Sequence, residues 1–153
     1  MQPVWADVKR VFEALSYVVK GMSPDGTELF FTISFETWRR KDTFDLCTYL
    51  EKKKTNGQTN IAWRLNLQLE LYRAKIWSTR SGKKPLRPMS FYILTNGEWG
   101  KGADPKVTIK QTADLLMQHG MLGGQVTIEF ISFAQTASGM QHISGITNTD
   151  FGV

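Results

Sequence analysis

Apolar residues recur at helical spacing at the start of the chain and again in its middle. From Val4 to Val19 they predict a helix that Gly21 ends. A longer helix through Trp77 is predicted after the polar loop Asn56–Thr59. Its apolar stripe consists of Ile61, Leu65, Leu69, Tyr72 and Ile76. A domain uses such a stripe to cover a sheet.

Between these helices the pattern predicts a turn, a strand and a short helix. Ser23–Gly26 has turn composition, and the aromatic and β-branched run Glu28–Phe35 is typical of a strand. Either Asp42 or Thr43 can cap a short helix from Phe44 to about Lys53.

The second half of the chain continues the alternation of helices and strands. Met89–Leu94 predicts a strand, Asp104 and Pro105 open a helix that runs to His119, and Gln125–Phe133 predicts a further strand. Such alternation favours an α/β fold: a three-layer, doubly wound, mostly parallel sheet with helices on both faces. We expect one domain over residues 1–140 and a weakly ordered tail over residues 141–153.

The run from Phe91 to Leu94 lacks polar alternation, as expected for a strand that helices cover on both faces. A polar loop then follows, and in open α/β sheets ligands bind where strands end. We therefore predict a ligand-binding face made of Thr95, Asn96, Gly97, Glu98 and Trp99. An Asn-Gly tight turn without function is the alternative for the loop, and packing over the sheet edge is the alternative to an interface role for Trp99.

Composition narrows the class of protein. With 153 residues and 41% hydrophobic content, the chain suits one domain. Its apolar runs are shorter than the roughly 20 residues of a membrane-spanning helix, so no membrane partner is expected. No secretion signal is recognisable, and a single cysteine, Cys47, fits a reducing compartment. We expect a cytoplasmic protein.

The net charge of +5 raises the question of nucleic-acid binding. Basic residues gather at Arg39–Lys41, at Lys52–Lys54 and between Lys75 and Arg87. Clusters at helix ends are commonly solvated and complement the helix dipole. No aromatic residues on which bases could stack alternate with the basic residues of these runs. Nucleic acid is therefore an alternative rather than the expected partner.

Enzymatic motifs are missing from the sequence. No glycine-rich phosphate loop follows a predicted strand, and no serine occupies a Gly-x-Ser-x-Gly elbow. His119 and His142 have no recognisable nucleophilic partner, and Cys47 has no nearby histidine. We therefore expect a protein that is not an enzyme; the alternative is a nucleotide-binding or hydrolytic enzyme on a doubly wound sheet.

At three places the chain resembles a von Willebrand factor type A domain of the intracellular kind. Asn56–Ile61 resembles the family's Gly-x-Thr loop, Tyr92–Gly97 its strand ending in Thr-Asp-Gly, and Val126–Phe133 the strand after the next helix. The resemblance covers Met1 to about Met140. It implies a module that binds another protein.

This resemblance also implies a metal ion-dependent adhesion site for magnesium or manganese. Thr59 matches the family's threonine, whereas Asn96 replaces the aspartate and the Asp-x-Ser-x-Ser loop is absent. An amide oxygen brings no negative charge to a hard cation. Thr59 and Asn96 would therefore form a degenerate site that binds metal weakly, unless missing ligands are supplied elsewhere. The resemblance also places Thr59 near Asn96 on the predicted ligand-binding face; the alternative is that Thr59 only caps the helix that starts at Asn60.

In the family that loop precedes the first helix, at which this chain begins. The resemblance thus suggests an N-terminally incomplete domain that lacks one central strand, with Met1 an internal methionine. Burying the side chains of such a strand contributes roughly 1.5–3 kcal/mol each. We therefore expect marginal stability or self-association.

Overall fold

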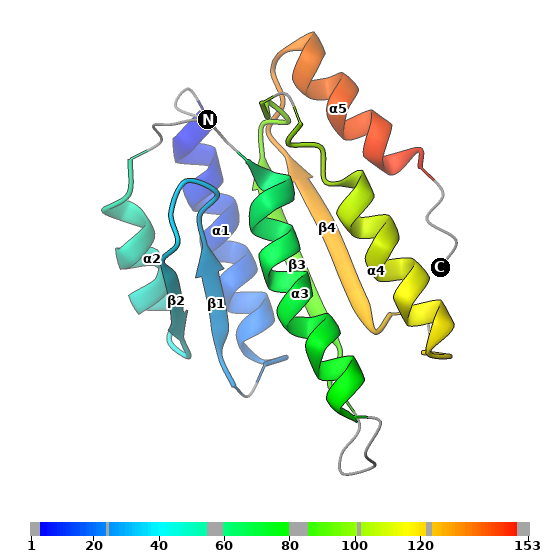
Figure 1. The fold of residues 1–153 in the computed structure, drawn as a ribbon. Coiled ribbons are helices and arrows are strands. Elements are labelled where there is room, and N and C mark those ends of the chain that lie inside the picture. The colour runs from blue at the N-terminus through cyan, green and yellow to red at the C-terminus, as the bar shows by residue number, and fades with distance from the viewer. Residues whose placement is uncertain are drawn as a thin grey trace. The chain divides into compact units, whose positions relative to one another are not determined.

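The computed structural model describes residues 4–23, 25–54, 60–79, 86–100, 102–121 and 124–149 (Figure 1). The chain divides into two compact units, residues 1–58 and residues 59–153. Both contain helices and strands, which confirms the predicted α/β class. Thr59, which was predicted to bind ligand and metal, lies outside the described residues.

The first unit contains α1 (Trp5–Lys20), β1 (Thr27–Phe30), β2 (Thr37–Arg40) and α2 (Thr43–Glu51). Both helices were predicted. Asp42 caps α2, because its side chain accepts a hydrogen bond from the backbone N–H of Phe44 at 2.9 Å. α1 packs against α2. Their buried apolar side chains are Val8, Phe12, Leu46 and Leu50.

The strand predicted over Glu28–Phe35 is wrong beyond Phe30. The chain turns there, with the Ser34 N–H 3.4 Å from the Phe31 carbonyl oxygen, and returns as β2. β1 and β2 pair antiparallel, with Leu29 opposite Trp38. The expectation of strands joined throughout by parallel crossovers is therefore wrong for this unit.

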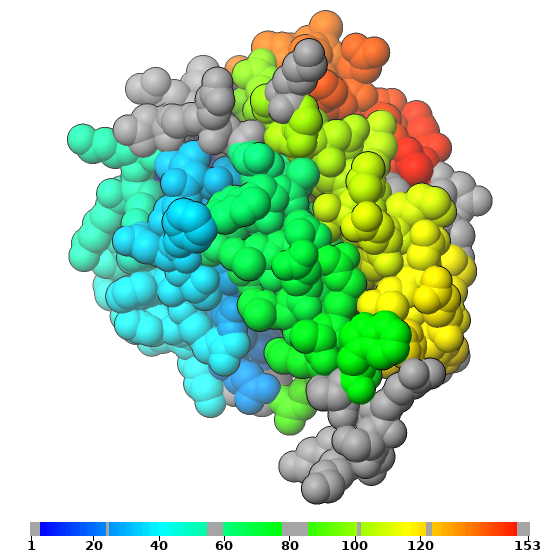
Figure 2. All heavy atoms as spheres, viewed as in Figure 1, coloured from blue at the N-terminus to red at the C-terminus, as the bar shows by residue number. Residues whose placement is uncertain are grey.

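The second unit contains α3 (Ile61–Thr79), β3 (Met89–Thr95), α4 (Lys106–Gln118), β4 (Val126–Ser132) and α5 (Ala137–Thr147). β3 and β4 are parallel, with Phe91 opposite Ile128, and α4 connects them. The order helix, strand, helix, strand was predicted. Figure 2 shows α3 and α4 side by side on one face of this unit.

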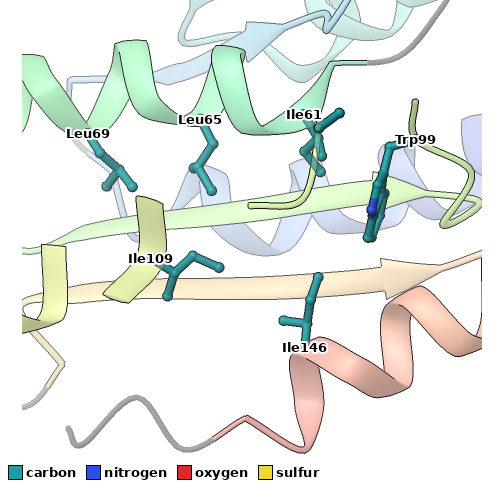
Figure 3. Close-up of a cluster of buried hydrophobic side chains, with 7 residues drawn as sticks. Ile61, Leu65, Leu69, Trp99, Ile109 and Ile146 are labelled. Atoms are coloured by element: carbon teal, nitrogen blue, oxygen red, sulfur yellow. The ribbon is translucent and has the colours of Figure 1, made fainter. Parts of the chain in front are cut away.

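The core of the second unit lies between α3, α4 and one face of the sheet (Figure 3). Every residue of the predicted α3 stripe is buried. Trp99, Ile109 and Ile146 join the stripe from three other segments of the unit. The sheet residues packed against this cluster are Phe91, Ile93, Val126, Ile128 and Phe130.

A polar contact of Tyr72 lies near the starts of β3 and β4. The buried Tyr72 hydroxyl donates to the Arg87 carbonyl oxygen at 2.8 Å and accepts from the Gln125 side-chain amide at 2.6 Å. These bonds tie α3 to the segments that lead into β3 and β4. Burial raises the pKa of Tyr72, so the hydroxyl stays protonated and able to donate.

The predicted weakly ordered tail from residue 141 onward is wrong as far as Thr149. α5 continues to Thr147, and the side chain of Ile146 is 5% exposed within the core cluster. Thr136 caps the helix by accepting from the Gly139 N–H at 3.0 Å. The described residues 141–149 therefore belong to the second unit.

Candidate functional site

The two parallel strands of the second unit end side by side. Thr95, the last residue of β3, pairs with Ser132, the last residue of β4. The Phe133 N–H donates to the Thr95 carbonyl oxygen at 2.7 Å. Both connecting loops therefore leave the sheet at the same edge, as predicted for a parallel pair.

Hydroxyl and amide side chains shape these loops by accepting from nearby backbone N–H groups. Thr95 Oγ1 accepts from Gly97 at 3.1 Å, and Ser132 Oγ accepts from Ala134 at 3.2 Å. Asn96 Oδ1 accepts from the Glu98 N–H at 3.3 Å. Each is a local turn in which the side chain replaces a backbone acceptor.

The loop after β3 touches the first turn of α5 through two glycines. Gly97 has φ +73°, and a Cβ built there would lie 2.2 Å from the Gly139 carbonyl oxygen. A Cβ at Gly139 would in turn lie 2.4 Å from the Asn96 carbonyl oxygen. Glycine at both positions allows the two backbones to approach this closely.

His142 fastens the same loop from the next turn of α5. Its Nδ1 lies 2.8 Å from the Gly97 carbonyl oxygen. Because a carbonyl can only accept, Nδ1 carries the hydrogen in this contact. The imidazole also stacks on the Trp99 indole, with ring centroids 5.3 Å apart and planes at 18°. The histidine thus orients both the loop backbone and the buried tryptophan.

Glu98 is an exposed residue of the loop after β3. Its carboxylate accepts from the Thr136 hydroxyl at 2.7 Å and lies 3.4 Å from the Asn96 side-chain amide nitrogen. No salt bridge joins it to a residue in the described part of the chain. It is therefore a negative charge held in one direction and open to solvent.

The predicted binding residues divide by accessibility. Thr95, Gly97 and Trp99 are buried, Asn96 is half-buried and Glu98 is exposed. Trp99 is 9% exposed and packs in the core. This favours a packing role for Trp99 over an interface role. Thr136, which contacts Glu98, is exposed, and so are Gln135 and Ser138, which lie near it in the chain. We call Glu98, Gln135, Thr136 and Ser138 the strand-end rim.

The contributions of Thr136, Gly139 and His142 were missed by the sequence analysis. Thr136 preceding Ala137–Gly139 is a helix N-cap signal that could have been used. Nothing in the sequence relates Gly139 to Gly97, because their contact depends on the tertiary fold.

The residues at this edge do not fit a magnesium or manganese ion. Asn96 Oδ1 and Thr95 Oγ1 already accept from the loop backbone, which leaves Glu98 as the carboxylate at the strand ends. Within the described ranges, no group of three or more His, Cys, Asp or Glu residues could hold a metal. Hard cations of this kind need several free oxygen ligands.

The basic clusters of the first unit contact its own side chains. Arg39 forms an ion pair with Glu28, and the Arg40 guanidinium lies 4.0 Å from the centroid of the Trp38 ring. Trp38 stacks on Tyr49 at 4.4 Å, and Lys53 donates to Glu36 at 2.6 Å. This stack was not predicted from the sequence. Its two rings contact Arg40 and Lys53, which belong to the basic clusters considered for nucleic-acid binding.

Cys47 belongs to α2 of the first unit, and His119 follows α4 in the second. Cys47 is half-buried, and burial raises the pKa of its thiol, which disfavours the reactive thiolate. His119 contacts the Trp77 ring edge-on, with centroids 4.7 Å apart.

No helix among the described residues is long and apolar enough to cross a membrane. Searches of family models, curated proteins and solved structures found no match to this chain.

Proposed function

We propose that the chain is a non-enzymatic module that binds another protein through the strand-end rim. The supporting observation is Glu98, an exposed carboxylate that Thr136 and Asn96 hold in place without a described cationic partner. A charge fixed before binding loses little conformational freedom when a partner arrives. Met140, whose side chain is 53% exposed near the start of α5, adds apolar contact area.

The wider arrangement we propose is that of a von Willebrand factor type A domain whose metal site is degenerate. Such a domain would be three-layered and doubly wound. In support, β3 and β4 are parallel, α4 connects them and their loops share one edge. The low number of cysteines favours a cytoplasmic location.

Site-specific photo-crosslinking tests the proposal. A photoreactive amino acid replaces Ser138 on the rim, and in a matched control it replaces Gln111, an exposed residue of α4. Each full-length variant is irradiated in an extract of the source cells. We expect a protein adduct from position 138 that persists at high salt, and none from position 111.

Two results would contradict this function. One is an equal adduct, or no adduct, from the two positions. The other is tight binding of arbitrary duplex nucleic acid with steep salt dependence, because counterion release dominates that kind of recognition.

A further inference from the structure

The outer edge of β3 carries backbone groups that no described residue of the second unit pairs. The backbone groups of Met89 and Thr95 point toward β4. The Met89 N–H donates to the Gln125 carbonyl oxygen at 3.0 Å, and the Thr95 carbonyl oxygen accepts from the Phe133 N–H. In a parallel ladder alternate residues point the same way. Ser90, Tyr92 and Leu94 therefore direct their N–H and C=O groups outward, where no hydrogen bond to another described residue is found.

This edge also lacks the devices that keep strands from pairing with other chains. Charged side chains and proline normally block an exposed edge. β3 contains neither between Met89 and Thr95, whereas β4 carries Glu129 and β2 carries Arg39 and Arg40.

We propose that β3 pairs antiparallel with β3 of a second copy of this chain. A two-fold axis at Tyr92 would place Tyr92 opposite its own counterpart and Ser90 opposite Leu94 of the second copy. All three outward-facing residues would then exchange N–H···O=C bonds with an outward-facing residue. The combined sheet would run β4, β3, β3, β4.

A second copy fits this edge better than an unrelated peptide for two reasons. The outward residues Ser90, Tyr92 and Leu94 are evenly spaced about Tyr92, so one strand is complementary to itself, as a two-fold interface requires. The strand is also uncharged, so the symmetric pairing brings no like charges together and offers a charged peptide nothing to recognise.

The proposal is independent of the strand-end rim, because the edge runs along β3 whereas the rim lies beyond its end. Sedimentation velocity of the full chain over a range of concentrations tests it. We expect a dimer for the natural sequence and for Ser90→Ala. Ser90→Pro removes an outward N–H and spares the β4 ladder, and we expect it to weaken dimerisation about tenfold or more.

Disulfide trapping fixes the register without relying on proline. In a Cys47→Ser background, Tyr92→Cys places two cysteines about 5.5 Å apart between Cα atoms, which suits a disulfide. Glu129→Cys, its neighbour on β4, would lie three strand spacings, about 14 Å, from its counterpart. We expect a crosslinked dimer from position 92 and none from position 129.

A natural chain that is monomeric at all concentrations would overturn the proposal. So would a dimer in which position 92 is trapped no better than position 129. If Ser90→Pro is shown by circular dichroism to be unfolded, the trapping result decides; if it is folded and dimerises as tightly as Ser90→Ala, the edge is not the interface.

Discussion

The Nδ1 atom of His142 lies 2.8 Å from the Gly97 carbonyl oxygen. This bond, the stack of His142 on Trp99 and the contact between Gly97 and Gly139 hold the loop after β3 against α5. Because Thr136 at the start of α5 also holds Glu98, the position of the rim depends on this attachment.

Replacing His142 with phenylalanine tests the hydrogen bond while keeping a stacking ring. Gly97 is buried, so its carbonyl would be left without that donor. We expect His142→Phe to lower the free energy of unfolding by about 1–3 kcal/mol, measured by urea denaturation. His119→Phe is the control, and we expect its effect to stay within about 0.5 kcal/mol. Equal effects of the two substitutions would contradict a specific role for the bond.

Gly97→Ala tests the close approach of the two backbones. The added methyl group would lie 2.2 Å from the Gly139 carbonyl oxygen. We expect a loss of about 3 kcal/mol or more, because both segments must shift. Gly102 has a similar φ of +78° and open space around it, so Gly102→Ala isolates the backbone cost of about 1–2 kcal/mol. Thermal melts in which both variants lose the same stability would remove the steric explanation.

The pH dependence of stability should report the pair of Glu36 and Lys53. Hydrogen bonds from Lys53 and Tyr49 lower the pKa of Glu36 below its ordinary 4.5, and the bond to Glu36 raises the pKa of Lys53 above 10.5. The Glu36 contribution is therefore present above pH 4.5 and lost as pH falls through its lowered pKa. The Lys53 contribution is present below pH 10.5 and lost as pH rises through its raised pKa.

We expect Glu36→Gln to be less stable than the natural chain at neutral pH, with the difference shrinking as pH falls below 4.5. Urea denaturation across the acid range measures it. Glu51→Gln, at the end of α2, is the control, since Glu51 forms no ion pair with another described residue. A difference for Glu36→Gln that does not change with pH would show that the ion pair is not its cause.

Restoring a carboxylate by Asn96→Asp tests the degenerate metal site. The side-chain oxygen of Asn96 accepts from the Glu98 N–H, and the other oxygens of the loop are similarly engaged. We expect magnesium to bind the natural chain and Asn96→Asp no more tightly than about 1 mM in calorimetric titration. Micromolar affinity in either protein would mean that residues outside this loop complete a coordination shell.

The helices and the parallel strands were predictable because their patterns are long and local. The α3 stripe from Ile61 to Ile76 and the apolar run of β3 each favour one structure along their whole length. The start of α2 was predictable for the same reason, because Asp42 is a common capping residue next to the helix that it caps.

β2 and the continuation of α5 beyond residue 140 were missed, because they depend on contacts distant in sequence. The turn between β1 and β2 contains no glycine or proline, and Trp38 of β2 stacks on Tyr49 of α2. α5 contains Gly139 and Gly145, which lower helix propensity, yet Gly139 is needed for the contact with Asn96 and Ile146 packs in the core. Tertiary packing outweighs local propensity in both cases.

The same distinction applies to the candidate site. The position of Thr95–Trp99 at a strand end followed from the alternation of strands and loops. The accessibility of these residues could not be predicted in the same way. It depends on α5, which buries Gly97 and Trp99 and brings Thr136 to Glu98.

The central claim, that Glu98 on the strand-end rim binds a protein partner, is tested most directly by an affinity measurement. The partner crosslinked at position 138 is identified, and its dissociation constant is measured by biolayer interferometry for Glu98→Ala and for Asp114→Ala. Asp114 is an α4 carboxylate 3.3 Å from the Lys110 ammonium group, and serves as the charge-matched control. We predict about a tenfold weakening for Glu98→Ala and an unchanged constant for Asp114→Ala. Equal affinities of both variants and the natural chain would contradict the claim.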